Sequence, residues 1–220
     1  MERPLARSID HTLLKPDAPS EAFDRLIQEG RRHRFAAVCL PPVYVRRAAA
    51  ALKNSGTAVC TVVGFPLGYI EPEVRIFESE RALEGGADEL DTVLDISWLK
   101  SGRDEEVLAD LSAWVDAVRE ISETAVTKVI LETVLLDDDE KRRAARLVAR
   151  AGADFVKTST GFAGGGATVA DVELLQAEVG DAIRIKASGG IRSRADAFAM
   201  LRAGASRLGT SSGVTLVSER

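Results

Sequence analysis

Short apolar runs alternate with amphipathic stretches along the whole chain, and this alternation constrains the fold more than any other feature. Repeated strand–helix units are typical of parallel sheets. Eight runs rich in Val, Ile and Leu have the composition of buried strands: 9–14, 35–40, 57–63, 89–94, 127–132, 154–159, 183–187 and 206–209. Seven stretches with helical character separate them: 21–32, 43–54, 73–84, 104–122, 138–151, 169–179 and 194–203. Eight units in 220 residues predict an α/β fold, a compact (β/α)8 TIM barrel whose eighth helix is short or missing.

The composition fits one globular domain over residues 1–220, because no linker divides the chain. The formal net charge is -5 and no basic stripe is present, which argues against nucleic-acid binding. No apolar run reaches membrane-spanning length and the N-terminus lacks a signal-peptide core, so we expect a cytoplasmic protein without membrane contact. Cys39 and Cys60 lack CxxC spacing, so we expect buried free thiols and no metal site.

Two lysines each end an apolar run that opens into a glycine-rich turn. Lys157 lies in the segment FVKTSTG and Lys186 in the segment IRIKASGG. A lysine at the end of a buried strand brings its amine next to apolar walls, and burial or a second cation favours the neutral, nucleophilic form of an amine. The pair of lysines therefore indicates amine chemistry on a carbonyl group.

Side-chain alternation within the strands selects the polar residues that face the barrel interior. The apolar neighbours of Lys186 and of Asp91 can pack on helices, which turns both charged side chains inward, and Asp10 and Thr12 share one face of the first strand. We expect two amines and two carboxylates to converge at the mouth. The alternative is a buried ion-pair network that only sets the strand register. Glu132, at the end of the fifth run, could be a site residue or a solvated rim carboxylate, and the sequence leaves both open.

Glycine-rich turns after the last three strands suit a phosphate group. Such turns expose backbone N–H groups and hydroxyls, and the loops after the seventh and eighth strands of barrels commonly bind phosphate. One glycine pair would be weak evidence, because turns need glycine in any case. Their common position on one rim predicts a phosphate site formed by Gly161, Gly189, Gly190, Gly209, Ser211 and Ser212.

Six ordered segments resemble the 2-deoxyribose-5-phosphate aldolase family: IDHTLLKP at 9–16, CTVVGFPLG at 60–68, GADELD at 86–91, FVKTSTGF at 155–162, KASGGIR at 186–192 and GTSS at 209–212. The resemblance runs over nearly the whole chain. It implies a lyase, a class I aldolase that reversibly cleaves 2-deoxy-D-ribose 5-phosphate to acetaldehyde and D-glyceraldehyde 3-phosphate in deoxyribose phosphate catabolism. Because an imine needs no metal, we expect no metal or other cofactor to take part. We also expect a homo-oligomer, a dimer or a tetramer.

The same resemblance assigns roles to the candidate residues. It makes Lys157 the Schiff-base lysine, Lys186 the second lysine that favours the neutral form of the first, and Asp91 the acid/base partner. The residues that it places in the shell around them are Asp10, Thr12 and Cys39. We expect these three and Thr158 among the residues that bind the substrate or its phosphate.

The chain departs from the family pattern at three positions, and two other functions compete with the one implied. Pro41 stands where members often have Asn, and Thr92 and Asp95 stand where Met and Asn are common, which leaves substrate tolerance and efficiency open. One competing function is a Schiff-base aldolase or transaldolase for a different sugar phosphate, and the motif set argues against it. The other is a phosphate-binding barrel without turnover, and the retention of both lysines with Asp91 argues against that one.

Overall fold

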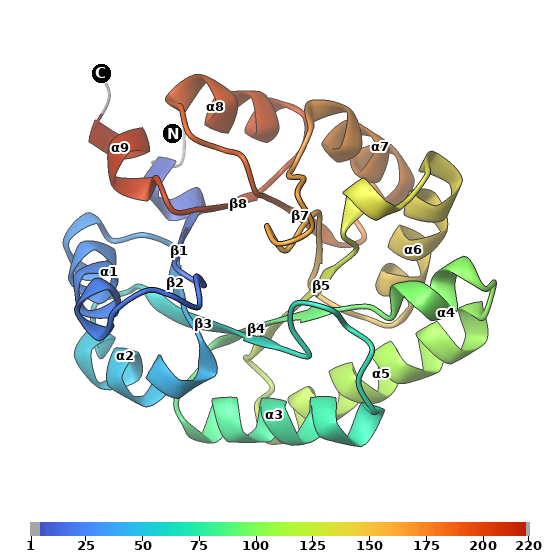
Figure 1. Cartoon of the computed structure of the whole chain (residues 1–220), viewed down its shortest axis with the longest axis horizontal. Coiled ribbons are helices and arrows are strands. Elements are labelled where there is room, and N and C mark those ends of the chain that lie inside the picture. Colours follow the sequence, from blue (N-terminus) through green and yellow to red (C-terminus); the bar gives the residue numbers. More distant parts are fainter. Residues whose placement is uncertain (1–4, 219–220) are drawn as a thin grey trace.

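The computed structural model describes residues 5–218, in which eight parallel strands close into a barrel in sequence order (Figure 1). The closure is made by the pairing of the last strand with the first. The strands are β1 (Ile9–Thr12), β2 (Ala37–Cys39), β3 (Ala58–Val63), β4 (Glu89–Val93), β5 (Val126–Ile130), β6 (Phe155–Lys157), β7 (Arg184–Ser188) and β8 (Arg207–Thr210). Every predicted apolar run contains most or all of one strand, and the predicted (β/α)8 barrel is confirmed.

The helices form a ring around the barrel (Figure 1). They are α1 (Ser20–His33), α2 (Val45–Leu52), α3 (Pro72–Glu84), α4 (Ile96–Lys100), α5 (Asp104–Ile121), α6 (Asp138–Arg150), α7 (Val169–Val179), α8 (Arg194–Arg202) and α9 (Gly213–Ser218), with 3-10 turns η1 (Leu5–Ser8), η2 (Pro42–Tyr44) and η3 (Thr133–Leu135). All seven predicted helices are present, and α9 is the short eighth one. Helix α4 was not predicted. No helix within residues 5–218 is long and apolar enough to cross a membrane.

Glycines in the left-handed conformation end three of the helices and turn the chain back toward the barrel. Gly86, Gly152 and Gly204 follow α3, α6 and α8 with φ of +96°, +78° and +119°. Side chains with a Cβ rarely adopt such angles, so glycine allows the sharp turn into the next strand. This repeated joint explains why short connections suffice for eight strand–helix units.

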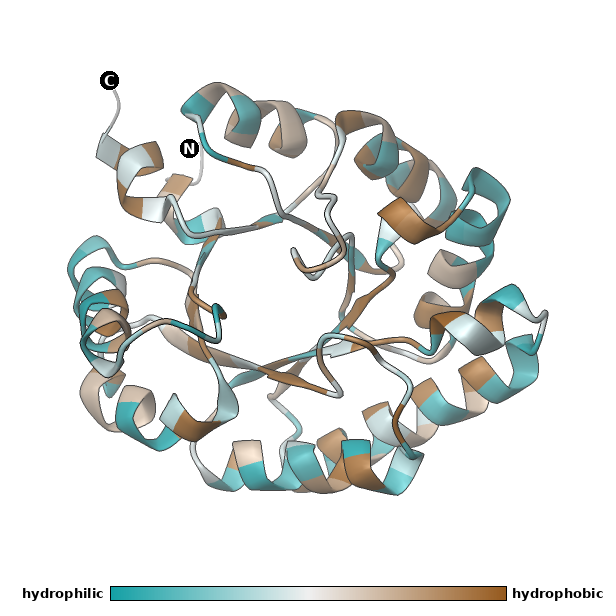
Figure 2. Ribbon diagram, in the orientation of Figure 1, coloured by the Kyte–Doolittle hydropathy of each residue, from teal (hydrophilic) through white to brown (hydrophobic). Residues whose placement is uncertain are grey.

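Hydrophobic side chains fill the layer between the strands and the helix ring. Trp114 on α5, Leu90 on β4 and Val129 on β5 are fully buried there. Figure 2 shows the same division, with hydrophobic residues along much of the strands and hydrophilic residues on the outer helix surfaces. The barrel interior differs from this apolar layer, because several inward positions carry charges that need partners away from water.

Candidate active site

Asp91 on β4 lies in the barrel interior, where three lysines donate hydrogen bonds to its carboxylate. Its Oδ2 accepts from the Nζ of Lys157 at 2.7 Å and from that of Lys186 at 2.8 Å. Its Oδ1 accepts from Lys128 at 2.8 Å. These four side chains are at most 2% exposed. The strand register brings them together, because Lys157 pairs with Lys186 and Asp91 pairs with Lys128 on neighbouring strands.

Asp10 on β1 supplies the second predicted carboxylate. Its Oδ2 lies 2.6 Å from Lys186 Nζ, and its Oδ1 accepts a hydrogen bond from Arg207 on β8. Lys186 therefore lies between the carboxylates of Asp10 and Asp91. The structure thus brings together, inside the barrel, the two lysines and two aspartates that the sequence selected. Lys157 is the last residue of β6, whereas the other three lie within their strands.

The sequence reasoning missed three charged residues of this cluster. Lys128 Nζ lies 2.8 Å from Glu89 Oε2, and Arg207 Nη2 lies 2.8 Å from Glu89 Oε1. Glu89 and Lys128 are buried, at 3% and 0% exposure. The signal that selected Asp91, a charged residue beside apolar ones in a strand, would also have found Lys128 in the run VTKVI.

Close contacts between opposite charges fix the protonation of the cluster. Burial raises the pKa of Asp91, but the ammonium groups of Lys128, Lys157 and Lys186 outweigh burial and hold that pKa well below its usual range. Burial likewise raises the pKa of Asp10, while Lys186 and Arg207 lower it to about 2. Burial lowers the pKa of Lys186, yet Asp10 and Asp91 raise it above its ordinary value. Both aspartates and Lys186 are therefore charged at neutral pH.

Within residues 5–218 the cluster holds one more basic group than carboxylates. Lys128 contacts the carboxylates of Glu89 and Asp91, and Lys186 contacts those of Asp10 and Asp91. Lys157 contacts only Asp91 Oδ2, which it shares with Lys186. Lys157 thus has the fewest opposite charges of the three lysines.

The two thiols face the same interior. Cys39 and Cys60 are register partners on β2 and β3, and both are buried free cysteines, as predicted. Cys60 Sγ donates to Asp91 Oδ1 at 3.2 Å, so Cys39 and Cys60 lie beside the charged cluster.

Two groups of these buried atoms have the spacing of a metal site. They are Cys39, Cys60 and Asp91, and Asp10, Cys60 and Glu89, each within 4.8 Å of one another. Lys128 Nζ lies 3.3 Å from Cys60 Sγ and 2.8 Å from both Asp91 Oδ1 and Glu89 Oε2. The ammonium group of Lys128 therefore occupies the position that a metal ion would take among these atoms. A divalent ion there would be repelled by the positive charge of Lys128 and would have to displace it.

A cavity of about 350 Å³ opens at the C-terminal ends of β1, β6, β7 and β8. Two cations that the sequence reasoning missed, the exposed Lys15 and Arg192, also line it. Ser212 is not among its lining residues, and its N–H donates to Thr210 Oγ1 at 2.9 Å. The residues predicted to bind phosphate or substrate that line this cavity are Thr12, Gly161, Gly189, Gly190, Gly209 and Ser211, and we call it the phosphate cavity after that prediction.

Thr158, expected near the substrate, lies beneath the cavity instead of lining it. The residue is fully buried, and its hydroxyl donates to the Ser188 carbonyl at 3.2 Å and accepts from the Ser188 N–H at 3.0 Å. Thr158 thereby joins the ends of β6 and β7, the strands that carry Lys157 and Lys186.

Gly209 makes room for Lys186 inside the barrel. A Cβ at position 209 would lie 2.4 Å from Ser188 Oγ and 3.2 Å from Lys186 Cε. The first distance is shorter than any ordinary contact, so a larger residue would displace the side chains beside the charged cluster.

The three departures from the family pattern leave the charged cluster intact. Thr92 Oγ1 accepts from Arg75 and donates to the Val63 carbonyl at 3.1 Å, so it braces β4 against β3. Asp95 accepts the Trp98 N–H at 2.9 Å and caps α4. Pro41 precedes the turn η2.

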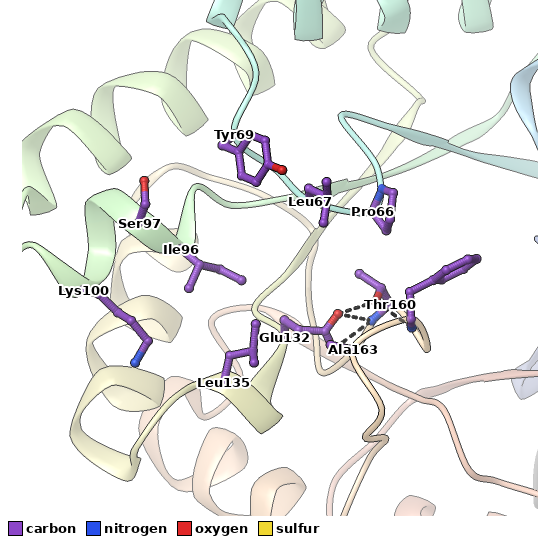
Figure 3. A pocket seen from close by; sticks show the side chains of 11 residues that line it. Pro66, Leu67, Tyr69, Ile96, Ser97, Lys100, Glu132, Leu135, Thr160 and Ala163 are labelled. Carbon is purple, nitrogen blue, oxygen red and sulfur yellow. Dashed lines mark hydrogen bonds between the residues drawn. The ribbon is translucent and has the colours of Figure 1, made fainter.

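A second, largely apolar cavity of about 440 Å³ lies between the loops after β3, β4, β5 and β6 (Figure 3). Glu132 and Thr160 line it, and Thr160 also lines the phosphate cavity. Glu132, which the sequence left undecided, is 2% exposed and is therefore no solvated rim carboxylate. Its carboxylate points to Thr160 (Figure 3).

Comparisons with known proteins agree with this geometry. A family model described as DeoC/LacD family aldolase matches residues 5–216. The chain is 53% identical over 212 residues to a deoxyribose-phosphate aldolase of Staphylococcus carnosus, covering 96% of this chain and 94% of the relative. It is 51% identical over 213 residues to one of Carboxydothermus hydrogenoformans, covering 97% and 93%.

Solved structures extend the likeness to three dimensions. A putative deoxyribose-phosphate aldolase from Coccidioides immitis superposes with a TM-score of 0.93 at 41% identity, over 99% of this chain and 86% of that one. A tetrameric deoxyribose phosphate aldolase from Aeropyrum pernix gives 0.90 at 39% identity, over 97% and 89%. Because sequence and structure match over nearly the full length, the chain belongs to the DeoC/LacD aldolase family.

Proposed function

We propose that this protein is a deoxyribose-phosphate aldolase that reversibly cleaves 2-deoxy-D-ribose 5-phosphate to acetaldehyde and D-glyceraldehyde 3-phosphate. The observation that carries the proposal is that Lys157 and Lys186 both donate a hydrogen bond to Asp91 Oδ2. This cluster lies beside a cavity that is lined by glycine turns and two cationic side chains. The names of the full-length relatives support the substrate.

In this reaction Lys157 is the nucleophile. Its neutral amine adds to the C1 aldehyde of the open-chain sugar, and loss of water from the carbinolamine leaves a protonated imine. The C2–C3 bond then breaks as the C3 hydroxyl loses its proton, and the electron pair of that bond moves into an enamine. The imine nitrogen is the electron sink, D-glyceraldehyde 3-phosphate leaves, and protonation at C2 followed by hydrolysis releases acetaldehyde and restores Lys157.

Asp91 and Lys186 handle the protons of this sequence. Asp91 is ionised and lies 2.7 Å from the Lys157 nitrogen, so it can accept a proton as the carbinolamine forms and collapses and return it later. Lys186 stays an ammonium group between Asp10 and Asp91. It shares Asp91 Oδ2 with Lys157, so its positive charge lies next to the reacting amine.

The phosphate group of the substrate fits the cavity at the ends of β6, β7 and β8. The N–H groups of the glycine turns can donate to its oxygens, and Lys15 and Arg192 supply positive charge. The negative net charge of the chain does not oppose this, because the attraction is local.

Borohydride reduction tests the assignment of the nucleophile. Sodium borohydride added with acetaldehyde should reduce the imine to a stable ethyl amine on Lys157, which peptide mapping by mass spectrometry locates. The Lys157→Leu protein should give no adduct, whereas Lys100→Leu, at an exposed lysine outside the cluster, should label like the wild type. An adduct on Lys186 or Lys128 in the wild type would contradict the proposal.

We also propose a cytoplasmic homo-oligomer. The tetrameric Aeropyrum pernix relative supports assembly, as do Val74 and Phe77, whose side chains are 46% and 60% exposed on α3. The phosphorylated substrate supports a cytoplasmic location. Light scattering coupled to size exclusion measures the first property, and a single monomer mass would contradict it. Cell fractionation measures the second.

A further inference from the structure

Glu132 combines an unfavourable backbone conformation with a buried carboxylate. Its φ is 56° and its ψ is 64°, in the left-handed region that side chains with a Cβ rarely adopt. Arg34 and Asn54 are the other non-glycine residues with positive φ in the described part of the chain, and both are exposed. Glu132 alone among them is buried, so its surroundings must compensate both for the backbone and for the loss of water around the charge.

Among the described residues, one residue on the neighbouring loop supplies the hydrogen bonds to this carboxylate. The Thr160 N–H lies 3.3 Å from Glu132 Oε1 and 3.2 Å from Oε2, and the Thr160 hydroxyl donates to Oε2 (Figure 3). No basic side chain of residues 5–218 forms an ion pair with Glu132, since every described interaction of this carboxylate is with Thr160. The carboxylate is therefore directed at this loop.

The turn that Glu132 holds faces the phosphate cavity. Thr160 Oγ1 also accepts the Phe162 N–H at 3.0 Å, which closes a tight turn around Gly161, whose φ is 87°. The Phe162 N–H is thus used within the turn, and the Thr160 N–H donates to Glu132. The N–H of Gly161 has no partner among the described residues, and Gly161 lines the phosphate cavity.

Glu132 itself lies on the other side of the turn. It lines the apolar cavity of about 440 Å³ and not the phosphate cavity, whereas Thr160 lines both. This placement keeps the negative carboxylate away from an anionic ligand while its hydrogen bonds still fix the turn.

We infer that Glu132 is a positioning residue that acts through Thr160 to hold the Gly161 N–H toward the phosphate group of the substrate. This inference rests on the proposed function for the identity of the substrate. The left-handed backbone of Glu132 directs its side chain at Thr160. An extended residue 132 would direct its side chain elsewhere and leave Thr160 without its acceptor.

Glycine at position 132 gives the sharpest test. Glu132→Gly removes the carboxylate but accepts the left-handed backbone, so the variant avoids the strain that Ala would suffer. Asn54→Gly is the matched control, because Asn54 has a φ of 62° at an exposed position before β3, at the other end of the barrel. Thermal unfolding verifies that both variants fold.

The measurements are KM and kcat for deoxyribose 5-phosphate and for unphosphorylated 2-deoxyribose, and inhibition by inorganic phosphate. Because one hydrogen bond to a charged group is worth a factor of about ten or more, Glu132→Gly should raise KM for the phosphorylated sugar and the inhibition constant of phosphate about tenfold. The kcat/KM for 2-deoxyribose should change less than about twofold, and Asn54→Gly should match the wild type. Glu132→Gln should fall between, because its amide oxygen accepts the Thr160 N–H but its NH2 group cannot accept the hydroxyl.

Equal loss of activity toward both sugars, with phosphate inhibition unchanged, would overturn the inference and leave Glu132 a purely structural residue. No change in any constant would overturn it as well. Calorimetric titration with inorganic phosphate separates this inference from the proposed function. If the wild type forms no borohydride adduct with acetaldehyde, the aldolase proposal fails, while phosphate affinity still reports on the Glu132 contact.

Discussion

Replacing Asp91 by Asn should lower both the stability and the activity of the protein by large amounts. The carboxylate accepts from three ammonium groups at 2.7–2.8 Å in a fully buried setting. Asn has the same shape but leaves these cations without the negative charge that they share. Removal of one member of a buried ionic network costs about 3–5 kcal/mol. For a chain of this size that corresponds to a fall in unfolding temperature of roughly 6–20 °C.

The same change should remove the proton transfers at Lys157, which we expect to lower kcat/KM by a further factor of about 10²–10⁴. Glu89→Gln is the matched control. Glu89 is also a buried carboxylate on β4 and contacts Lys128 and Arg207, but it does not contact Lys157. The control should lose stability and keep most of its imine formation, measured by borohydride trapping.

Urea unfolding and the cleavage rate, measured on both variants at a temperature where both are folded, distinguish stability from chemistry. If Asp91→Asn and Glu89→Gln lose activity to the same extent, Asp91 has no special part in the reaction. If Asp91→Asn is as stable as the wild type, the ionic network is not what holds the barrel interior.

Two further results are expected from the charges of the site. Arg192→Met and Lys15→Met should each raise KM for deoxyribose 5-phosphate about tenfold while leaving 2-deoxyribose cleavage nearly unchanged, because each removes a cation from the phosphate cavity. Steady-state kinetics with both sugars measures this, and equal effects on the two would mean that the phosphate binds elsewhere. The pKa of Asp10 falls from 3.8 to about 2 on folding, so the stability it contributes is present above pH 3.8 and is lost as the pH drops toward 2. In the Asp10→Asn protein, the free energy of unfolding should therefore fall by about 2 kcal/mol less between pH 5 and pH 2 than it does in the wild type. The same fall in both proteins would refute this prediction.

The alternation of apolar runs was enough to predict the barrel, because each strand must be buried on both faces while each helix buries one. The inward direction of Lys186 and Asp91 followed from the same alternation. Strand ends were predicted less well: the fifth run was extended to residue 132, whereas β5 ends at Ile130. Buried loop residues such as Leu131 are as apolar as strand residues, so composition alone does not mark where pairing stops.

Other features depend on contacts between distant segments, which a local pattern does not contain. Helix α4 is five residues long, which is too short for a repeating helical pattern of apolar residues to be recognised. Its clearest local signal is the N-cap Asp95. Thr158 lies in a matching motif but braces Ser188 beneath the cavity. The role of Glu132 requires the loop after β6 to lie against the end of β5. The residues next to Glu132 in the sequence do not predict that contact.

The seven charged side chains inside the barrel come from six different strands, from Asp10 on β1 to Arg207 on β8. The hydrogen bond between those two joins residues 197 positions apart. A nascent chain that lacks β8 consequently holds its carboxylates without Arg207, and one that lacks β7 and β8 leaves Asp10 with neither of its cations. The charged cluster is therefore complete only when the barrel is closed. Turnover by a fragment supplemented with the missing strands would report on closure of the barrel.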